Sequence, residues 1–229
     1  MNTQSMRSRT RSILKKIGWG AMLLMAMFVS LLVSRYLSLD SDVFFPEQRA
    51  VYLANLAMLL THIVASTLAL IIGPFQFLPA IRKGRRITVH RWLGRAYLLG
   101  VLFGGLSGLY MARLAYGGII SELGFTALAI LWLYTGYQAY RHIRARDING
   151  HRRWMTRNYA LTFAAVMLRT WLPISGALGI DFLMAYRVIA WMCWIPNLLV
   201  VEWIIRRSAW GRSAEQENRL DAVTGYSTN

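Results

Sequence analysis

Six apolar runs, each near twenty residues long, constrain the fold of this chain more than any other feature. A helix needs about 20 apolar residues to cross the hydrocarbon core of a bilayer, and inside lipid its backbone must satisfy every hydrogen bond internally. The predicted spans are residues 18–38, 51–73, 93–115, 119–141, 155–175 and 183–205. The sequence therefore predicts an all-α fold, a polytopic transmembrane bundle of about six helices.

The composition agrees with a lipid environment. Of the 229 residues, 56% are hydrophobic and 16% are charged, whereas soluble domains carry about 25% charged residues. The formal net charge of +16 would suit a nucleic-acid partner, but the cations stand in short blocks between apolar runs and not on one polar surface. We therefore expect the lipid bilayer to be the partner and no nucleic acid to be bound.

The positions of the cations predict the topology. Most of the 26 lysines and arginines lie in the N-terminal tail, in the loops after the second and fourth spans, and in the C-terminal tail. Since cytoplasmic segments are enriched in Lys and Arg, both termini are predicted to be cytoplasmic. The predicted organisation is a basic cytoplasmic tail over 1–17, the transmembrane bundle over 18–207 and a mobile cytoplasmic tail over 208–229.

One motif occurs twice, at the start of the third and of the fifth apolar run. Its copies are His90-Arg91-Trp92 with Arg95 and Tyr97, and His151-Arg152-Arg153-Trp154 with Arg157 and Tyr159. Both copies keep the spacing Trp-x-x-Arg-x-Tyr, so they indicate a weak internal repeat whose two halves enter the membrane from the same side. Both histidines are therefore predicted to lie at the cytoplasmic edge of a span.

The two histidines of this motif are candidate ligands. Imidazoles at equal depth on two helices could hold a haem b between them or supply half of a metal site, and guanidinium groups pair well with haem propionates. A glycine face on the third span would let a flat ring or another helix approach. The candidate cofactor-binding residues are His90, His151, Arg91, Arg95, Arg152, Arg157, Gly104 and Gly108, with His90 and His151 as the candidate metal ligands. The same cations would equally anchor the protein to anionic phospholipids.

A second set of candidates lies inside the apolar runs. Polar side chains in a membrane helix face the bundle interior or a water-filled path, because lipid does not solvate them. At 100° per residue, Asn158, Thr162 and Arg169 fall on one line of the fifth span, together with His151. His62 is predicted near the middle of the bilayer, because it lies about 11 residues into its span. The intramembrane polar candidates are therefore His62, Asn158, Thr162 and Arg169.

Three functions remain open on these residues. The first is a haem- or metal-binding membrane redox component that uses His90 and His151. The second is a small proton-coupled transporter with a polar path through His62, Asn158 and Thr162. The third is a non-catalytic, lipid-anchored partner or sensor subunit, which would assemble with another membrane subunit or as a homo-oligomer. The sequence contains no catalytic motif, so an enzyme acting alone is not expected.

The chain also resembles a known family through a series of motifs in a fixed order. These motifs are His62, Gly73-Pro74-Phe75-Gln76, Arg82, His90-Arg91-x-Leu93-Gly94-Arg95-x-Tyr97, Ser107-Gly108, Trp132, Arg146-Asp147-Ile148, His151-Arg152-Arg153-Trp154-Met155-x-Arg157 and Leu168-Arg169. Over roughly residues 50–207 the chain is similar to the bacterial predicted membrane proteins grouped as domain of unknown function 2306. The resemblance implies a multi-pass membrane protein in which His62, His90, His151 and Arg169 hold the positions of the family's polar signature, and it implies no particular activity.

Overall fold

The computed structural model describes residues 3–207, and within that range the chain folds into helices without a strand. Six helical stretches are long and apolar enough to cross a membrane, namely Ser12–Ser38, Leu56–Gln76, Gly84–Ala112, Ile119–Arg144, Ile148–Ala177 and Phe182–Arg207. Each predicted span overlaps one of them. The prediction of an all-α transmembrane bundle of about six helices is therefore confirmed.

The helices follow one another with short connections. The long elements are α1 (Thr3–Ser34), α3 (Leu56–Gln76), α4 (Ile87–Ala112), α5 (Ile119–Arg144), α6 (Ile148–Thr162), α7 (Ala164–Ala177) and α8 (Phe182–Met192), and residues 195–207 are again helical. The short elements are η1 (Arg35–Ser38), η2 (Ser41–Val43), η3 (Pro46–Gln48) and α2 (Arg49–Ala54) before α3, and η4 (Pro79–Ile81) and η5 (Gly84–Arg86) before α4. Helix α1 begins at Thr3 and so runs through most of the segment 1–17 that was predicted as a tail. The tail predicted over 208–229 lies outside the described residues.

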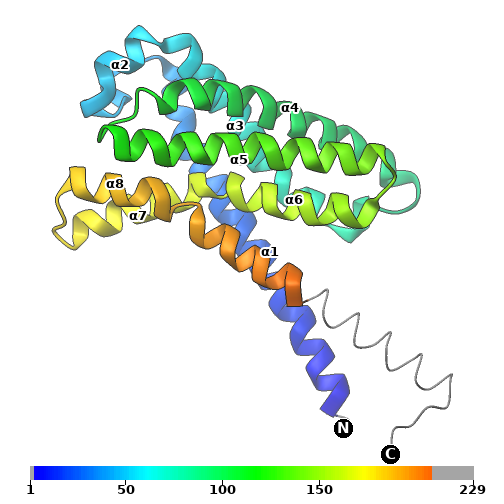
Figure 1. The fold of residues 1–229 in the computed structure, drawn as a ribbon. Helices are drawn as coiled ribbons and strands as arrows, with labels where there is room; N and C mark the ends of the chain where they lie inside the picture. The colour runs from blue at the N-terminus through cyan, green and yellow to red at the C-terminus, as the bar shows by residue number, and fades with distance from the viewer. Residues whose placement is uncertain (1–2, 208–229) are drawn as a thin grey trace, which may run out of the picture.

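The bundle has two ends of different character (Figure 1). The basic end holds the segments 77–86 and 145–147 with the first turns of α4 and α6, and the far end holds the segments 35–55, 113–118 and 178–181. Helix α3 packs along α4, α4 along α5, and α5 along α6, whereas α1 crosses the bundle at an angle and contacts α3 and α7. Helix α1 starts, and the helical residues 195–207 end, on the side of the basic end.

Three of the predicted spans are interrupted helices. Asn55 separates α2 from α3, Phe163 separates α6 from α7, and residues 193–194 separate α8 from the last helix. A break frees backbone carbonyls that lipid cannot satisfy, so side chains must bond to them. The Asn197 amide does this at the last break, because its Nδ2 donates to the carbonyl of Cys193 at 3.0 Å and to that of Ala160 at 3.2 Å.

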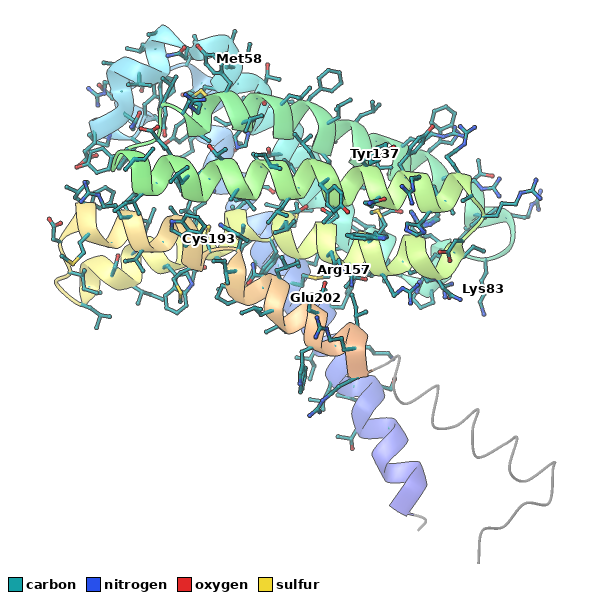
Figure 2. All side chains as sticks on the ribbon, in the orientation of Figure 1. Met58, Lys83, Tyr137, Arg157, Cys193 and Glu202 are labelled. Atoms are coloured by element: carbon teal, nitrogen blue, oxygen red, sulfur yellow. The ribbon has the colours of Figure 1, made fainter. Side chains whose placement is uncertain are left out.

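An ion pair ties the last helix to α6. Arg157 donates to both carboxylate oxygens of Glu202, from Nε and from NH2, and Figure 2 shows the two side chains pointing toward one another. A bidentate pair of this kind fixes the geometry of both side chains. Arg157, which the sequence assigned to a cofactor, is therefore already engaged by a carboxylate.

The repeated motif has the same local structure in both copies. The Arg95 guanidinium lies 4.8 Å from the ring centroid of Trp92, and that of Arg157 lies 4.6 Å from the ring centroid of Trp154. Tyr97 and Tyr159, two residues after each arginine, are buried in the main core. The spacing Trp-x-x-Arg-x-Tyr thus stacks an arginine on a tryptophan three residues earlier and sends a tyrosine inward.

Glycines and alanines allow α3 and α4 to approach closely. A Cβ atom at Gly100 would lie 2.7 Å from the carbonyl oxygen of Ala65, and one at Gly104 would lie 2.7 Å from the Ser66 hydroxyl. Two turns further along α3, a Cβ atom at Gly73 would overlap the ring of Tyr159. Small residues at helix contacts are the usual means of association in membranes, because close backbones gain van der Waals contact.

We expect Gly73→Ala to lower the unfolding temperature of the protein in neutral detergent. The new methyl group would displace the buried Tyr159 ring, and overpacking of this kind costs about 1–3 kcal/mol. Gly18→Ala is the matched control, because nothing lies within 4 Å of a Cβ atom there. It should leave the unfolding temperature unchanged or raise it slightly, because alanine favours a helix over glycine by about 1 kcal/mol. Equal unfolding temperatures for both variants would contradict the described packing of α3 on α6.

Candidate functional site

A cavity of about 250 Å³ lies in the half of the bundle nearer the far end. We call it the His62 cavity. Residues of α1 and of helices α3 to α8 line it, together with residues of the segments 35–55 and 113–118. The polar groups of its lining are Gln48, His62, Ser66, Thr162, Arg169 and the tyrosines Tyr36, Tyr52, Tyr116 and Tyr186. The remaining lining is mostly aliphatic or aromatic, so the cavity combines a few polar groups with an apolar body, as ligand pockets do.

His62 and Arg169 lie at similar depth. His62 is six residues into α3, and Arg169 is eight residues before the end of α7, which places them about 9 Å and about 12 Å from the far ends of their helices at 1.5 Å per residue. The prediction that His62 lies near the middle of the bilayer assumed a helix from residue 51. The break at Asn55 shortens that span to Leu56–Gln76 and moves His62 toward the far end.

The imidazole of His62 is fixed by the backbone of α4. Its Nδ1 lies 2.8 Å from the carbonyl oxygen of Gly104. Because a carbonyl oxygen only accepts, Nδ1 carries the hydrogen, and within residues 3–207 no hydrogen bond involves Nε2. A Cβ atom at Gly108 would lie 2.9 Å from the imidazole ring. Gly108 therefore makes room for the ring of His62, and Gly104 holds the ring through its carbonyl oxygen.

Arg169 is a cation without a carboxylate partner in the described part of the chain. Its NH1 donates to the carbonyl oxygen of Ala165 at 3.1 Å, one turn earlier on α7. The three ion pairs found between residues 3 and 207 join Arg49 to Asp42, His142 to Asp147, and Arg157 to Glu202. A guanidinium has five N–H donors, and an unpaired charge at this depth costs several kcal/mol. Arg169 therefore has N–H groups available for an anion, and an anion would stabilise its buried charge.

Aromatic side chains cover the cavity at the far end. Tyr36 stacks on Phe44 with a centroid separation of 5.4 Å, and Tyr52 contacts both rings edge-on. Burial raises the pKa of the Tyr52 phenol well above its usual value, the neighbouring Tyr186 and Tyr36 raise it further, and the charge of Arg169 opposes the rise. Tyr52 therefore keeps its proton at neutral pH and is a hydrogen-bond donor next to the cavity.

The opposite wall of the cavity is a closed hydrogen-bond network, which we call the Tyr97 network. The Tyr97 hydroxyl donates to Asn158 Oδ1 at 2.6 Å and lies 2.9 Å from the Thr162 hydroxyl. Asn158 Nδ2 donates to the Trp132 carbonyl and to the Thr135 hydroxyl, and Trp132 Nε1 donates to Thr162. Every polar group of the Asn158 side chain thus has a partner, and the network lies between the cavity and the basic end.

The structure brings the two motif histidines together at the basic end. His90 and His151 are each the fourth residue of their helix, α4 and α6, and they are close enough to interact electrostatically. Gly104 lies fourteen residues after His90, about 21 Å away along α4. Gly104 and Gly108 therefore belong to the His62 cavity and do not share a site with His90 and His151. Within residues 3–207, no group of three or more His, Cys, Asp or Glu side chains could hold a metal ion.

Sequence reasoning missed most of the partners of the polar candidates. It named His62, Asn158, Thr162 and Arg169, but it gave no role to Trp132 and did not name Thr135 on α5 or the tyrosines at the far end. The repeated motif did identify Tyr97, which is buried in the main core. No local pattern in the sequence pairs residues of three different helices.

A family model described as predicted membrane protein (DUF2306) matches residues 59–205. The matched range includes His62, Arg169, His90 and His151, and with them the Tyr97 network. No curated protein and no solved structure matches the chain.

We expect Tyr97→Phe to destabilise the protein. The variant removes the donor to Asn158 Oδ1 and leaves that atom buried without its partner, a loss that costs about 1–3 kcal/mol. The measurement is the unfolding temperature in neutral detergent. Tyr137→Phe is the control, because Tyr137 is 61% exposed on the surface of α5, and surface changes of this kind stay within about 0.5 kcal/mol. Equal stability of the two variants would show that the Tyr97 network does not hold the bundle together.

Proposed function

The chain belongs to the DUF2306 family of predicted membrane proteins, and on that premise we propose that it binds a small amphipathic carboxylate in the His62 cavity. One observation carries the proposal: within residues 3–207, Arg169 lines an apolar cavity inside the membrane and no carboxylate of the chain neutralises it. A bound anion would supply the missing counter-charge. The apolar lining would receive the rest of the ligand.

The number of charges favours a carboxylate over a neutral ligand or a more highly charged one. Arg169 supplies one fixed positive charge, and a carboxylate matches it with one negative charge and two oxygens suited to a guanidinium. A neutral ligand would leave Arg169 unpaired in a region of low dielectric constant. The Tyr52 hydroxyl can donate to the same headgroup from a neighbouring wall.

The volume limits the size of the ligand. At about 30 Å³ per water molecule, the 250 Å³ of the cavity holds on the order of eight water-sized groups. A carboxylate with a short hydrocarbon chain, such as hexanoate, fits this volume. A longer chain would have to extend past the aromatic side chains at the far end.

We also propose that the basic end faces the cytoplasm of a bacterial cell, so that the His62 cavity opens toward the outer side of the inner membrane. The cations of segments 77–86 and 145–147 support this orientation, because cytoplasmic loops are enriched in Lys and Arg. The ligand would then reach the cavity from the outer leaflet or from outside the cell.

A proton-coupled transporter is the second candidate, since His62 is a titratable group that lines the same cavity. Transport would require a path from the cavity to the basic end. The Tyr97 network lies across that path, so Asn158 and Thr162 would have to exchange partners during each cycle. Binding requires no such rearrangement, and we therefore prefer it.

Haem binding by His90 and His151 has less support than binding in the His62 cavity. His90 and His151 lie near one another, but Gly104 and Gly108 face His62, and Arg157 is paired with Glu202. A Soret absorbance band that disappears in both His90→Ala and His151→Ala would favour haem as a ligand of the basic end.

We expect Arg169→Gln to weaken carboxylate binding by roughly 10–100 fold, because a hydrogen bond to a charged group contributes about 1.5–3 kcal/mol and 1.4 kcal/mol is a factor of ten. The measurement is the dependence of the unfolding temperature in neutral detergent on the concentration of hexanoate, with hexanol as the uncharged ligand of equal chain length. Hexanoate should stabilise the wild-type protein more than hexanol does.

Arg113→Gln is the matched control, because it removes the same charge from an exposed position near the far end. It should keep the response to hexanoate. The proposal fails if hexanoate and hexanol stabilise the wild-type protein equally, or if Arg169→Gln and Arg113→Gln respond alike.

The orientation can be tested with single cysteines in a Cys193→Ala background. Lys83→Cys and Ala145→Cys at the basic end should react with a membrane-impermeant maleimide only after the cells are opened. Leu178→Cys, at the far end and 71% exposed, should react in intact cells. The reverse pattern would place the His62 cavity on the cytoplasmic side.

A further inference from the structure

Five polar residues gather at the basic end, where α3, α4 and α6 meet. We call them the basic cluster: Gln76, Arg82, His90, His151 and Arg152. Gln76 is the last residue of α3, Arg82 lies in the following loop, and the others stand in the first turns of α4 and α6. None of them lines the His62 cavity.

In the described part of the chain, the fixed charges near His90 are the guanidinium groups of Arg82, Arg152 and Arg91, and the imidazole of His151 lies near it as well. Burial lowers the pKa of the Arg82 guanidinium, and the charge of Arg152 lowers it further. Like charges held this close repel one another, so the cluster is unfavourable unless an anion joins it.

The nearest carboxylate along the chain is already occupied. Asp147 accepts a hydrogen bond from the backbone N–H of Gly150 at 2.8 Å and another from His142 Nδ1 at 2.9 Å. The Gly150 bond, with His142 and the charge of Arg153, lowers the pKa of this carboxyl. Asp147 therefore caps α6 and pairs with His142, and it does not act among the charges on His90.

Two nitrogen atoms of the cluster are buried without a hydrogen-bond partner, Gln76 Nε2 and His90 Nδ1. Gln76 is only 8% exposed, and its Oε1 lies 3.5 Å from where a Cβ atom of Gly94 would stand. Gly94 is one turn after His90, so the Gln76 amide packs against the face of α4 that carries His90. Buried polar atoms without partners are rare in native proteins, and each requires an explanation such as an ion.

We propose that the basic cluster binds a phosphate group between α3, α4 and α6. The phosphate oxygens would accept from Gln76 Nε2, His90, Arg82 and Arg152 and would neutralise the repulsion among the cations. The first turns of α4 and α6 add the positive ends of two helix dipoles.

A phosphate suits this position better than a carboxylate. It carries more negative charge and more acceptor oxygens, which match several converging donors. The cluster lies at the ends of three spans, at the depth of lipid headgroups, and basic pockets between transmembrane helices bind phosphorylated headgroups. The phosphate can belong to a lipid or to a soluble molecule, since both present the same group.

The test uses the full chain in neutral detergent and measures the unfolding temperature against three probes. These are inorganic phosphate, dihexanoyl phosphatidic acid, and dihexanoylglycerol, which lacks the phosphate. Stabilisation by phosphatidic acid alone identifies a lipid headgroup, and stabilisation by inorganic phosphate as well identifies a soluble source. The proposal is overturned if dihexanoylglycerol stabilises the protein as much as phosphatidic acid does and inorganic phosphate has no effect.

Variants separate this site from the His62 cavity and from the surface. Arg82→Gln with His90→Gln should weaken the response to phosphate at least tenfold. Arg85→Gln, an exposed arginine of the same loop, should keep it. Arg169→Gln should also keep it, because that residue belongs to the carboxylate proposed for the cavity.

One further variant keeps the test decisive if the double variant does not fold. Gln76→Glu has the same shape and supplies a negative charge inside the basic cluster. It should raise the unfolding temperature in the absence of phosphate and abolish the further rise that phosphate causes in the wild-type protein. A lower unfolding temperature with an unchanged phosphate response would refute the site.

Discussion

Polar groups buried away from water must form hydrogen bonds within the protein, and the packing of the helices depends on those bonds. The side chain of Asn158 is the clearest example. This side chain is fully buried, and it holds α6 to α4 through Tyr97 and to α5 through Trp132 and Thr135. In lipid, helices gain little from hydrophobic association, so hydrogen bonds and close packing must hold them together. The wall of the His62 cavity and the separation of the two ends both depend on this one network.

Local patterns predicted the spans, because hydropathy depends only on neighbouring residues. The line of Asn158 and Thr162 on one face of the fifth span could also be read from the sequence, because it follows the period of a helix. The break at Asn55 could not, since the apolar run continues across it. Nor could the neighbours of two glycines of α4 be predicted: only the packing of α3 against α4 places Ser66 next to Gly104 and the His62 ring next to Gly108.

The repeated motif led to a cofactor interpretation because it concentrates histidine, arginine and tryptophan at helix ends. In the structure, the arginine stacks on the tryptophan and the tyrosine enters the core, in both copies. These contacts account for the spacing without a ligand. The stacking does not explain the position of His90 and of the cations around it, where residues 3–207 offer no anion.

The His62 cavity and the basic cluster both hold positive charge without an anion among residues 3–207, so a ligand at one site could affect the other. His90 of the basic cluster and Gly104, which contacts His62, are about 21 Å apart along α4. At an effective dielectric constant of about 20, two unit charges at that distance interact by about 0.8 kcal/mol. Allosteric coupling between sites is typically about 1–3 kcal/mol. Stronger coupling would therefore have to pass through a shift of α4 against α6, and the Tyr97 network is the contact that such a shift would have to break.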